Sequence, residues 1–404
     1  MLLRSSYLKK GTIVSVVLCC LLVIFHLGCG GGSSNTPKVS KLAKRAFVPI
    51  NTTSVLSSDR IDILDASKDQ FTAFTIALSV SRATLVQPGA SGTTLIFGSE
   101  NNGLDIVDNT NEKLSNSAVI QLAGATESMV ETSDAKAIYA AVRSTGQIYT
   151  IDVANASVIS TSITAPSVRR LALSHNNSKL LAFSDNSDSL SVITFSSTSP
   201  TGDHSTPSTV SSLDRPSFGV FSSDDSKAYV LNCGPECGGR AASVAMLDMT
   251  QDPPKVLSTI PVSGATTALI DSGKLYVAGT MVSSGNPTGT GQLTIIDLGS
   301  FTPVGNPIPI GNGFHSLLSL ASNNKLFVGA RTCTTGCLSI VDLSASTAVI
   351  ATDPGNVTGI APIPGRNVAY VTVGGELRIY DTTTSKPQAN QLDIVGTAAG
   401  VVAP

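Results

Sequence analysis

A short apolar segment that ends in aspartate recurs through the chain, and this internal repeat limits the possible folds more than any other feature. A second apolar segment, often of the form Leu-Tyr-Val-Ala and preceded by lysine, comes before each copy. The copies follow one another at intervals of 39 to 53 residues, and the fourth has phenylalanine in place of the aspartate. The eight copies end at Asp65, Asp108, Asp152, Phe195, Asp248, Asp297, Asp342 and Asp381.

A period of about 40–50 residues with four short strands per unit is typical of a β-propeller. A lone four-stranded sheet with apolar residues on both faces exposes them to water, whereas radially stacked sheets bury each face against a neighbour. Folds of the α/β class need helices between the strands, and no segment after residue 45 keeps an amphipathic helical period over three turns. The sequence therefore predicts an all-β fold, with a single propeller over residues 45–404.

The two ends of the chain predict how the ring closes. The first unit begins at its second strand, at Arg45, and has no first strand of its own. The last unit continues into Gly396–Pro404, which is similar to other first strands such as Gly264–Ile270. We therefore expect this C-terminal segment to join the first blade. The sequence therefore predicts eight four-stranded blades. Seven blades are the alternative, if the first or the long fourth unit is an addition that lies outside the ring.

Charge and motifs exclude several classes of function. Charged residues make up 13% of the chain and the net charge is −2, so the clustered basic surface that nucleic acid requires is missing. No nucleophile elbow, phosphate-binding loop or zinc-protease motif occurs. His175, His204 and His315 lie in different units, without a second histidine at ligand spacing. We predict no metal site and no cofactor.

The first 29 residues read as an export signal. Basic residues up to Lys10 precede an apolar run over Thr12–Leu27, which is short for a membrane span. The Gly28-Cys29 pair that closes the run resembles the lipobox of bacterial lipoproteins, although His26 stands where an aliphatic residue is usual. The resemblance implies that Cys29 is lipidated and becomes the mature N-terminus. An uncleaved or ordinarily cleaved signal peptide is the alternative.

The residue after the cysteine bears on location. Gly30 rather than aspartate follows Cys29, which by the same resemblance implies the outer membrane. Residues 30–44 are rich in Gly, Ser and Thr at their start and are predicted to form a flexible tether. We therefore expect a cell-envelope protein, held to the membrane by an N-terminal lipid on the periplasmic or cell-surface side.

The repeats resemble those of the YVTN-type propellers, a family of bacterial and archaeal surface and lactonase-like proteins. The segments that carry the resemblance are Tyr229-Val230-Leu231-Asn232, Tyr276-Val277-Ala278-Gly279 and Tyr370-Val371-Thr372-Val373, and the resemblance spans residues 45–404. The motif is a packing motif whose aspartate is expected to tie a turn through its side chain. The resemblance implies the propeller fold, but the family holds binding modules, scaffolds and a few enzymes, so the fold alone selects no function.

Four cysteines outside the N-terminal segment form two pairs at equal spacing. Cys233 and Cys237 form one pair, Cys333 and Cys337 form the other, and both lie between the second and third strands of their units. A disulfide across each loop fits an exported protein. A shared zinc site is the alternative, although the pairs lie 100 residues and two units apart.

The corners between the fourth strand of one unit and the first strand of the next lie at one mouth of a propeller channel. Basic groups from several blades can converge there on an anionic ligand. In lactonase-like members of the resembled family, Arg, Glu and His near this mouth act on a lactone; solvated loop residues are the alternative reading. Alignment of the units places six polar residues near this corner: Arg82, Glu127, Arg169, Arg170, Arg215 and His315.

Three functional hypotheses follow. The leading one is a cell-envelope lipoprotein whose propeller is a binding or scaffolding module for a protein, a glycan or a small anionic ligand. The second is a lactonase-like hydrolase that uses the Arg/Glu/His mouth, and the third is a structural surface-layer component. The insertion over residues 196–212 and the two cysteine loops depart from the minimal repeat, so we expect partner contacts there.

Overall fold

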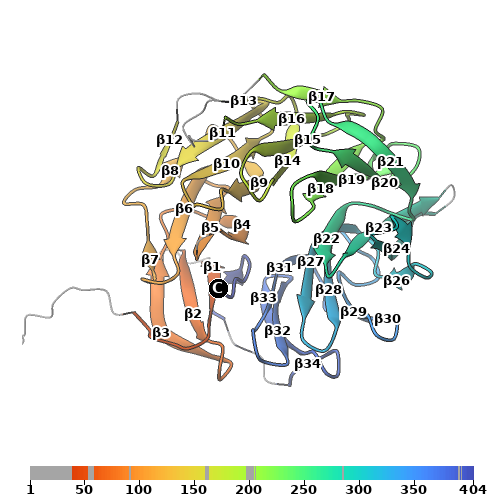
Figure 1. Cartoon of the computed structure of the whole chain (residues 1–404). Helices are drawn as coiled ribbons and strands as arrows, with labels where there is room; N and C mark the ends of the chain where they lie inside the picture. The colour runs from red at the N-terminus through yellow and green to blue at the C-terminus, as the bar shows by residue number, and fades with distance from the viewer. Residues whose placement is uncertain are drawn as a thin grey trace, which may run out of the picture. The chain divides into compact units, whose positions relative to one another are not determined.

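The computed structural model describes residues 39–52, 59–90, 92–159, 163–196, 204, 206–283, 286–389, 392 and 394–404. The predicted signal peptide, Cys29 and most of the tether lie outside the described residues, as does most of the insertion after residue 196. The described part of the chain forms eight antiparallel sheets arranged in a ring (Figure 1). Within it, the one helix is the short 3-10 helix η1 (Gly234–Cys237), and no helix has the length and apolar character needed to cross a membrane.

Each sheet is one blade, whose strands follow one another from the axis outward in chain order, except that the C-terminal β35 (Thr397–Ala398) is the innermost strand of the first blade (Figure 1). The first four blades are β35 (Thr397–Ala398), β1 (Arg45–Asn51), β2 (Arg60–Asp65) and β3 (Gln70–Ala77); β4 (Ala83–Pro88), β5 (Thr93–Gly98), β6 (Gly103–Asp108), β7 (Lys113–Leu114) and β8 (Ile120–Gln121); β9 (Thr126–Glu131), β10 (Ala137–Val142), β11 (Gln147–Asp152), β12 (Ser157–Val158) and β13 (Ile163–Thr164); β14 (Val168–Leu173), β15 (Lys179–Ser184), β16 (Leu190–Thr194) and β17 (Ser208–Val210).

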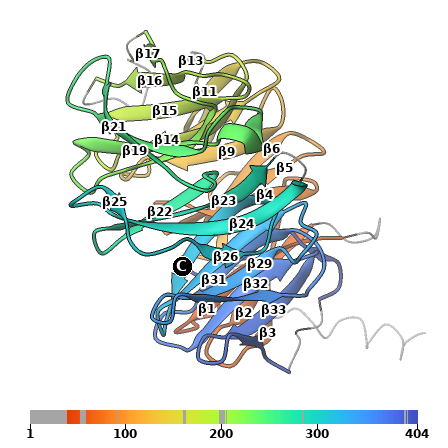
Figure 2. The ribbon, with the colours of Figure 1, turned by 90° about the vertical axis from the view of Figure 1, so that its right-hand side faces the viewer.

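The other half of the ring repeats this pattern, and the sixth blade has two long strands, β23 and β24, that Figure 2 shows side by side. The blades are β18 (Pro216–Phe221), β19 (Lys227–Asn232), β20 (Ser243–Asp248) and β21 (Lys255–Pro261); β22 (Thr267–Asp271), β23 (Lys274–Ser283), β24 (Asn286–Asp297), β25 (Thr302–Pro303) and β26 (Ile308–Ile310); β27 (Phe314–Ala321), β28 (Lys325–Arg331), β29 (Leu338–Asp342) and β30 (Thr347–Ala351); β31 (Val357–Pro362), β32 (Val368–Val373), β33 (Glu376–Asp381) and β34 (Lys386–Pro387).

Radial stacking explains the apolar pattern of the second strands. In β10, Ile138 and Val142 pack toward the preceding blade, whereas Tyr139 and Ala141 pack toward the following one. Successive side chains of a strand point to opposite faces, so a strand between two neighbours is apolar at every position. The buried apolar side chains of the described residues form eight clusters, one between each pair of neighbouring blades.

The C-terminal segment closes the ring, as the sequence predicts. Ala398 pairs with Ile50 of β1, and the backbones of Phe47 and Val402 exchange hydrogen bonds of 2.8 and 3.0 Å. Ala398 and Val401 are buried between the first and last blades, and Val402 is buried as well. Both the eight-blade prediction and the strand that joins the first blade are therefore confirmed, and the seven-blade alternative is wrong.

The aspartate of the repeat ties the turn after the third strand, as interpreted from the sequence. In seven blades its carboxylate accepts a hydrogen bond of 2.7–3.1 Å from a backbone N–H two or three residues later. The turn hydrogen bonds of Asp152, for example, hold the pKa of its carboxyl below the usual value. The fourth blade has no such aspartate and continues instead into the long insertion.

Both cysteine pairs form disulfides within their loops. Cys233 bonds to Cys237 and Cys333 to Cys337, with Cα–Cα distances of 5.6 and 5.4 Å. The predicted pairing is therefore confirmed, and the shared zinc site is wrong because the sulfurs are bonded to one another.

Polar contacts strengthen the seam between the first and last blades. Arg366 of the last blade binds the carboxylate of Asp69 through two hydrogen bonds of 2.5 and 2.9 Å, and Tyr370 donates a third of 2.5 Å. Although burial opposes the charge of Asp69, these donors hold its pKa below the usual value. The seam therefore joins residues about 300 positions apart through one carboxylate.

Removal of the closing strand is expected to destabilise the whole ring. Deletion of residues 396–404 exposes the apolar side chains that Ala398, Val401 and Val402 cover. We expect a loss on the order of 5 kcal/mol in the free energy of unfolding, measured by urea denaturation. Deletion of the exposed Pro404 alone is the control and should leave the transition unchanged. An unchanged midpoint for the long deletion contradicts this role.

Asp69→Asn is expected to lower the free energy of unfolding at pH 7 by about 2 kcal/mol, because it removes the charge that Arg366 binds. The folded-state pKa lies below the unfolded value of 3.8, so the contribution is present above about pH 4 and is lost as the pH falls further. The difference between wild type and variant should therefore shrink from pH 7 to pH 3. Asp271→Asn, on an exposed turn, is the matched control, and an equal loss in both variants refutes the prediction.

Candidate functional site

Strand direction gives the ring two distinct ends. The loops that join fourth to first strands and second to third strands share one end, which we call the mouth, and the other turns share the opposite end. All described lysines lie at the opposite end: Lys41, Lys44, Lys68, Lys113, Lys136, Lys179, Lys227, Lys255, Lys274, Lys325 and Lys386. All described arginines except Arg45 and Arg366 lie toward the mouth: Arg60, Arg82, Arg143, Arg169, Arg170, Arg215, Arg240, Arg331 and Arg378. Arginine binds planar anions through two parallel hydrogen bonds, so the mouth is the end suited to recognise them.

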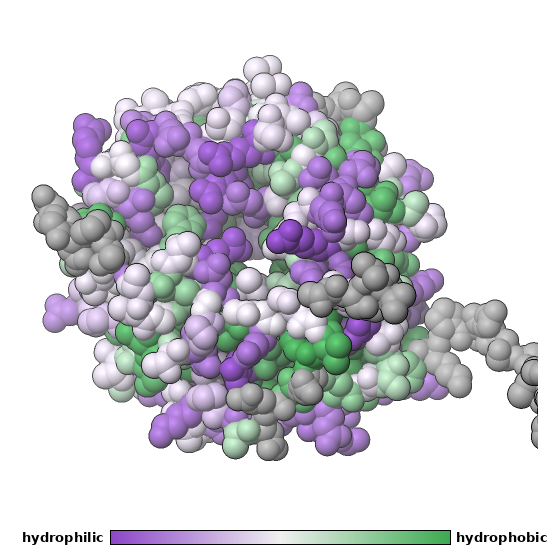
Figure 3. Space-filling model, turned by 180° about the vertical axis from the view of Figure 1, so that it is seen from behind, coloured by the Kyte–Doolittle hydropathy of each residue, from purple (hydrophilic) through white to green (hydrophobic). Residues whose placement is uncertain are grey.

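A cavity of about 450 Å³ lies between the innermost strands on the side of this mouth. Its volume falls within the usual range for small-molecule sites. The space-filling view shows one face of the ring hollowed at its centre, with hydrophilic side chains around much of the hollow (Figure 3). Of the six predicted site residues, Glu127, Arg169 and Arg170 line the cavity together.

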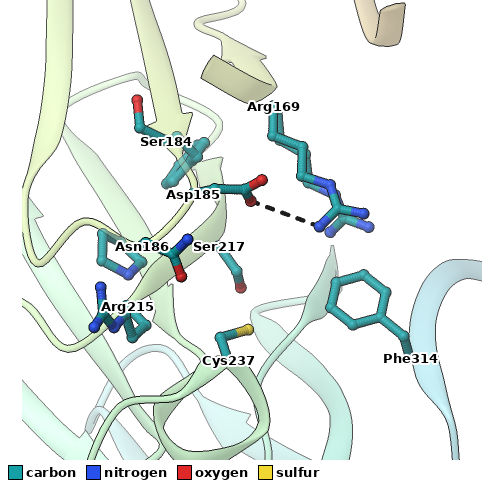
Figure 4. Close-up of a pocket in the computed structure, with 11 residues that line it drawn as sticks. Arg169, Ser184, Asp185, Asn186, Arg215, Ser217, Cys237 and Phe314 are labelled. Atoms are coloured by element: carbon teal, nitrogen blue, oxygen red, sulfur yellow. Dashed lines mark ion pairs between the residues drawn. The ribbon is translucent and has the colours of Figure 1, made fainter. Parts of the chain in front are cut away.

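Arg169 is neutralised by carboxylates of its own site. Its Nε lies 3.0 Å from Glu127 Oε2, and its Nη1 lies 3.6 Å from Asp185 Oδ1 (Figure 4). Asp185 also pairs with Arg143 at 2.6 Å. Burial opposes the charge of Arg169, but the two carboxylates outweigh it and raise its pKa. Arg169 is therefore held in place and has little charge left for a ligand.

Arg170, by contrast, has no carboxylate within ion-pair distance among the described residues. Its Nη1 donates a 2.8 Å hydrogen bond to the carbonyl of Thr266, two blades away. Its guanidinium carbon lies 5.5 Å from the ring centre of Phe218 and 5.1 Å from that of Phe314. Burial, with the positive charges of Arg169 and Arg331, lowers the pKa of Arg170 to about 10. The side chain is thus a fixed cation without an ion pair of its own, on which Glu127 and Glu236 act only at longer range.

Arg331 is a second cation of this kind, which the sequence did not single out. It is the last residue of β28, lines the same cavity, and has no ion pair within the described ranges. Its Nε is buried without a hydrogen-bond partner. The signal lay in the sequence, because Arg331 immediately precedes a cysteine loop. It was missed because the alignment considered only the corner between fourth and first strands.

Glu236 was also missed, although it lies inside the first cysteine loop. Its Oε2 accepts a 2.7 Å hydrogen bond from the backbone N–H of Thr280. Burial raises the pKa of Glu236 to about 7, against that hydrogen bond and the charge of Arg170. The disulfide therefore fixes a carboxyl group beside the cationic part of the mouth.

Arg215 lies next to this group rather than in the main cavity. It borders a small pocket of about 50 Å³ together with Arg169, Arg170 and Cys237 (Figure 4). Its Nε lies 3.7 Å from Asp188 Oδ1. The structure thus places Arg215 near the predicted cluster but with a carboxylate of its own.

Arg82 and His315 do not line the cavity. Arg82 is an exposed loop residue with φ of 56°, and its N–H donates to Asp59 Oδ2 at 2.7 Å. His315 is 1% exposed, and its Nε2 lies 2.9 Å from the carbonyl of Gly311. Its neighbours Phe314 and Ser316 line the cavity. Because successive side chains of a strand point to opposite faces, the side chain of His315 points into the interface between blades. The one-residue uncertainty of the alignment was enough to misplace it.

Comparison with protein-family models finds no match, and comparison with curated proteins finds none either. Solved structures do match. The dihydro-heme d1 dehydrogenase NirN in complex with DHE has a TM-score of 0.63 at 13% identity, over 90% of this chain and 75% of that chain. Apo AztD from Citrobacter koseri has 0.59 at 13%, over 89% and 98%. A putative 6-phosphogluconolactonase from Bacteroides fragilis has 0.52 at 13%, over 91% and 99%.

The likeness is one of fold. The chain shares the propeller architecture of lactonase-like and NirN-like structures, and at this identity their activities do not carry over. Within the described residues, no group of three or more His, Cys, Asp or Glu side chains is placed to hold a metal ion. The function must therefore be argued from the mouth itself.

His315→Gln is expected to reduce the loss of unfolding free energy that occurs as the pH falls. Burial lowers the folded-state pKa of His315 to about 4, so between pH 6.5 and 4 only the unfolded chain takes up the proton. Wild type should lose on the order of 2 kcal/mol of unfolding free energy over this range, and the variant should lose less. Urea titrations at pH 7 and pH 4.5 measure how steeply the free energy of unfolding changes with pH. His175→Gln, at an exposed histidine, is the control. Equal slopes for all three proteins contradict the assignment.

Proposed function

We propose that this protein is a binding module whose propeller holds a small anionic ligand in the mouth cavity, at Arg170 and Arg331. The observation that carries the proposal is that both guanidinium groups face one cavity of about 450 Å³ without a carboxylate partner in the described chain. A cation shielded from water, as Arg170 is, is destabilised unless a counter-charge is near. An anion in the cavity supplies that charge.

The contacts of Arg170 prepare it for this role. The Thr266 carbonyl and the rings of Phe218 and Phe314 fix the guanidinium before a ligand arrives. A donor fixed in advance loses little conformational entropy on binding, so more of the electrostatic attraction appears as affinity. Arg169 adds less attraction for an anion than Arg170, because Glu127 and Asp185 already neutralise its charge.

Location is a second part of the proposal, and it rests on the sequence. The apolar run before Cys29, the Gly/Ser-rich start of residues 30–44 and two loop disulfides together favour an exported lipoprotein of the cell envelope. On this proposal the lipid at Cys29 holds the propeller at the membrane, where it meets ligands outside the cytoplasm.

The hydrolase hypothesis gains no support from these contacts. His315, the one histidine that the sequence placed near the channel mouth, is buried away from the cavity. Glu127, the carboxylate that does line the cavity, is held by Arg169 at 3.0 Å. Two cations without ion-pair partners among the described residues explain binding of an anion more directly than they explain turnover.

Arg170→Met is expected to weaken anion binding at least tenfold, because it removes a charge-assisted contact while keeping the length of the side chain. Isothermal titration of the full chain with citrate, benzoate and inorganic phosphate measures the effect. Arg82→Met is the matched control, since Arg82 lies at the same mouth but outside the cavity. An equal loss in both variants, or no binding of any of these anions to the wild type, overturns the proposed function.

A further inference from the structure

The mouth cavity is polarised from one side to the other. Its cationic side is formed where the Arg170 guanidinium reaches Thr266 and Phe314, close to Arg331. Its other side, the apolar side, is formed by the innermost strands β4 and β9, where the partly exposed side chains of Leu85, Val86 and Val130 stand among the polar Thr84, Gln87, Glu127 and Ser128. Met129 and Leu171 also border the cavity, but both are 2% exposed and pack between blades.

Three polar groups on the apolar side already have partners, and one of them, Ser128 Oγ, accepts a 3.0 Å hydrogen bond from the Leu171 N–H. The side-chain amide of Gln87 donates to the backbone carbonyl of Met129 at 2.5 Å, and Glu127 is paired with Arg169. A ligand that placed hydroxyl groups against this side would leave them without hydrogen-bond partners, at a cost in affinity. The apolar side therefore disfavours a sugar and suits a hydrocarbon body.

Unsatisfied donors mark where the ligand's charged group belongs. Arg331 Nε and Ser316 Oγ are both buried, lack hydrogen-bond partners and belong to residues that line the cavity. They come from β27 and β28, which are paired so that Phe314 lies opposite Arg331. Buried polar atoms without partners are rare, and one explanation of such a pair is a ligand that completes it.

We infer that the ligand is an amphipathic organic acid, a carboxylate or phosphate monoester with its acid group at Arg170, Arg331 and Ser316 and its apolar body against Leu85, Val86 and Val130. This inference rests on the proposed function and names its class of ligand. Each methylene group that becomes buried against the apolar side strengthens binding about fourfold. An alkyl chain of several carbons therefore binds far more tightly than its acid group alone.

Titration of the full chain with matched ligands tests the inference. Octanoate is expected to bind at least tenfold more tightly than acetate, which lacks the apolar body, and than octanamide, which lacks the charge. Octyl phosphate and glucose 6-phosphate repeat the contrast of apolar and polar bodies with a phosphate head group. Octyl phosphate against octanoate compares the phosphate head group with the carboxylate. Below its micelle-forming concentration, each alkyl ligand reports on the single site.

Substitutions on the apolar side test the contribution of the ligand's apolar body separately from that of its acid group. The double variant Val86→Thr and Val130→Thr keeps the size of both side chains but adds a hydroxyl to each, so it should weaken octanoate severalfold and leave acetate unchanged. Arg170→Met should weaken both. Val349→Thr, on the exposed outer strand β30, is the matched control and should weaken neither.

The outcomes distinguish this inference from the proposed function. If acetate or glucose 6-phosphate binds as tightly as octanoate, and Arg170→Met abolishes that binding, the anion site stands and the amphipathic ligand is overturned. If octanamide binds as tightly as octanoate, the cavity recognises apolar bodies without the acid group, and both ideas fail.

Discussion

Burial of every blade face against a neighbour is the constraint on which the rest of this structure depends. A four-stranded sheet that is apolar on both sides is unstable alone, and the eight inter-blade clusters of the described chain remove that surface from water. A ring satisfies this requirement only if it closes. Closure here is made by a C-terminal strand beside β1 and by the Asp69 carboxylate that Arg366 and Tyr370 bind.

Closure also determines where function can develop. Once the blades are fixed, the innermost strands bring side chains from distant parts of the sequence to one cavity, as Arg170 and Thr266 show across 96 residues. The loops at the mouth are free to vary because they do not carry the packing. The first cysteine loop illustrates this freedom: its disulfide holds Glu236 next to the cationic cluster without altering the strands on either side.

Lysines and arginines lie at opposite ends of the ring, and this separation agrees with a functional role for the mouth. Lysines precede second or fourth strands at the turns opposite the mouth, where a strongly hydrated ammonium group can reach solvent; among the described lysines Lys325, paired with Asp342 at 2.5 Å, is the buried exception. Arginines gather at the mouth, where stacking on Phe218 and Phe314 and partial burial suit a guanidinium. A chain with only 13% charged residues thus concentrates its anion-recognising groups at one end.

The sequence by itself determined the fold class, the closing strand and the aspartate turns, and it favoured eight blades and two loop disulfides, because each follows from spacing along the chain and from local chemistry. Only the tertiary structure decided the site. A strand alternates its faces at every residue, so an alignment uncertain by one residue cannot separate His315, which is buried in the blade, from Phe314 and Ser316, which line the cavity. Which arginine is neutralised depends on partners from other loops and blades: Arg169 meets Asp185, whereas Arg170 and Arg331 meet no carboxylate in the described chain. Those pairings are long-range contacts that no local pattern records.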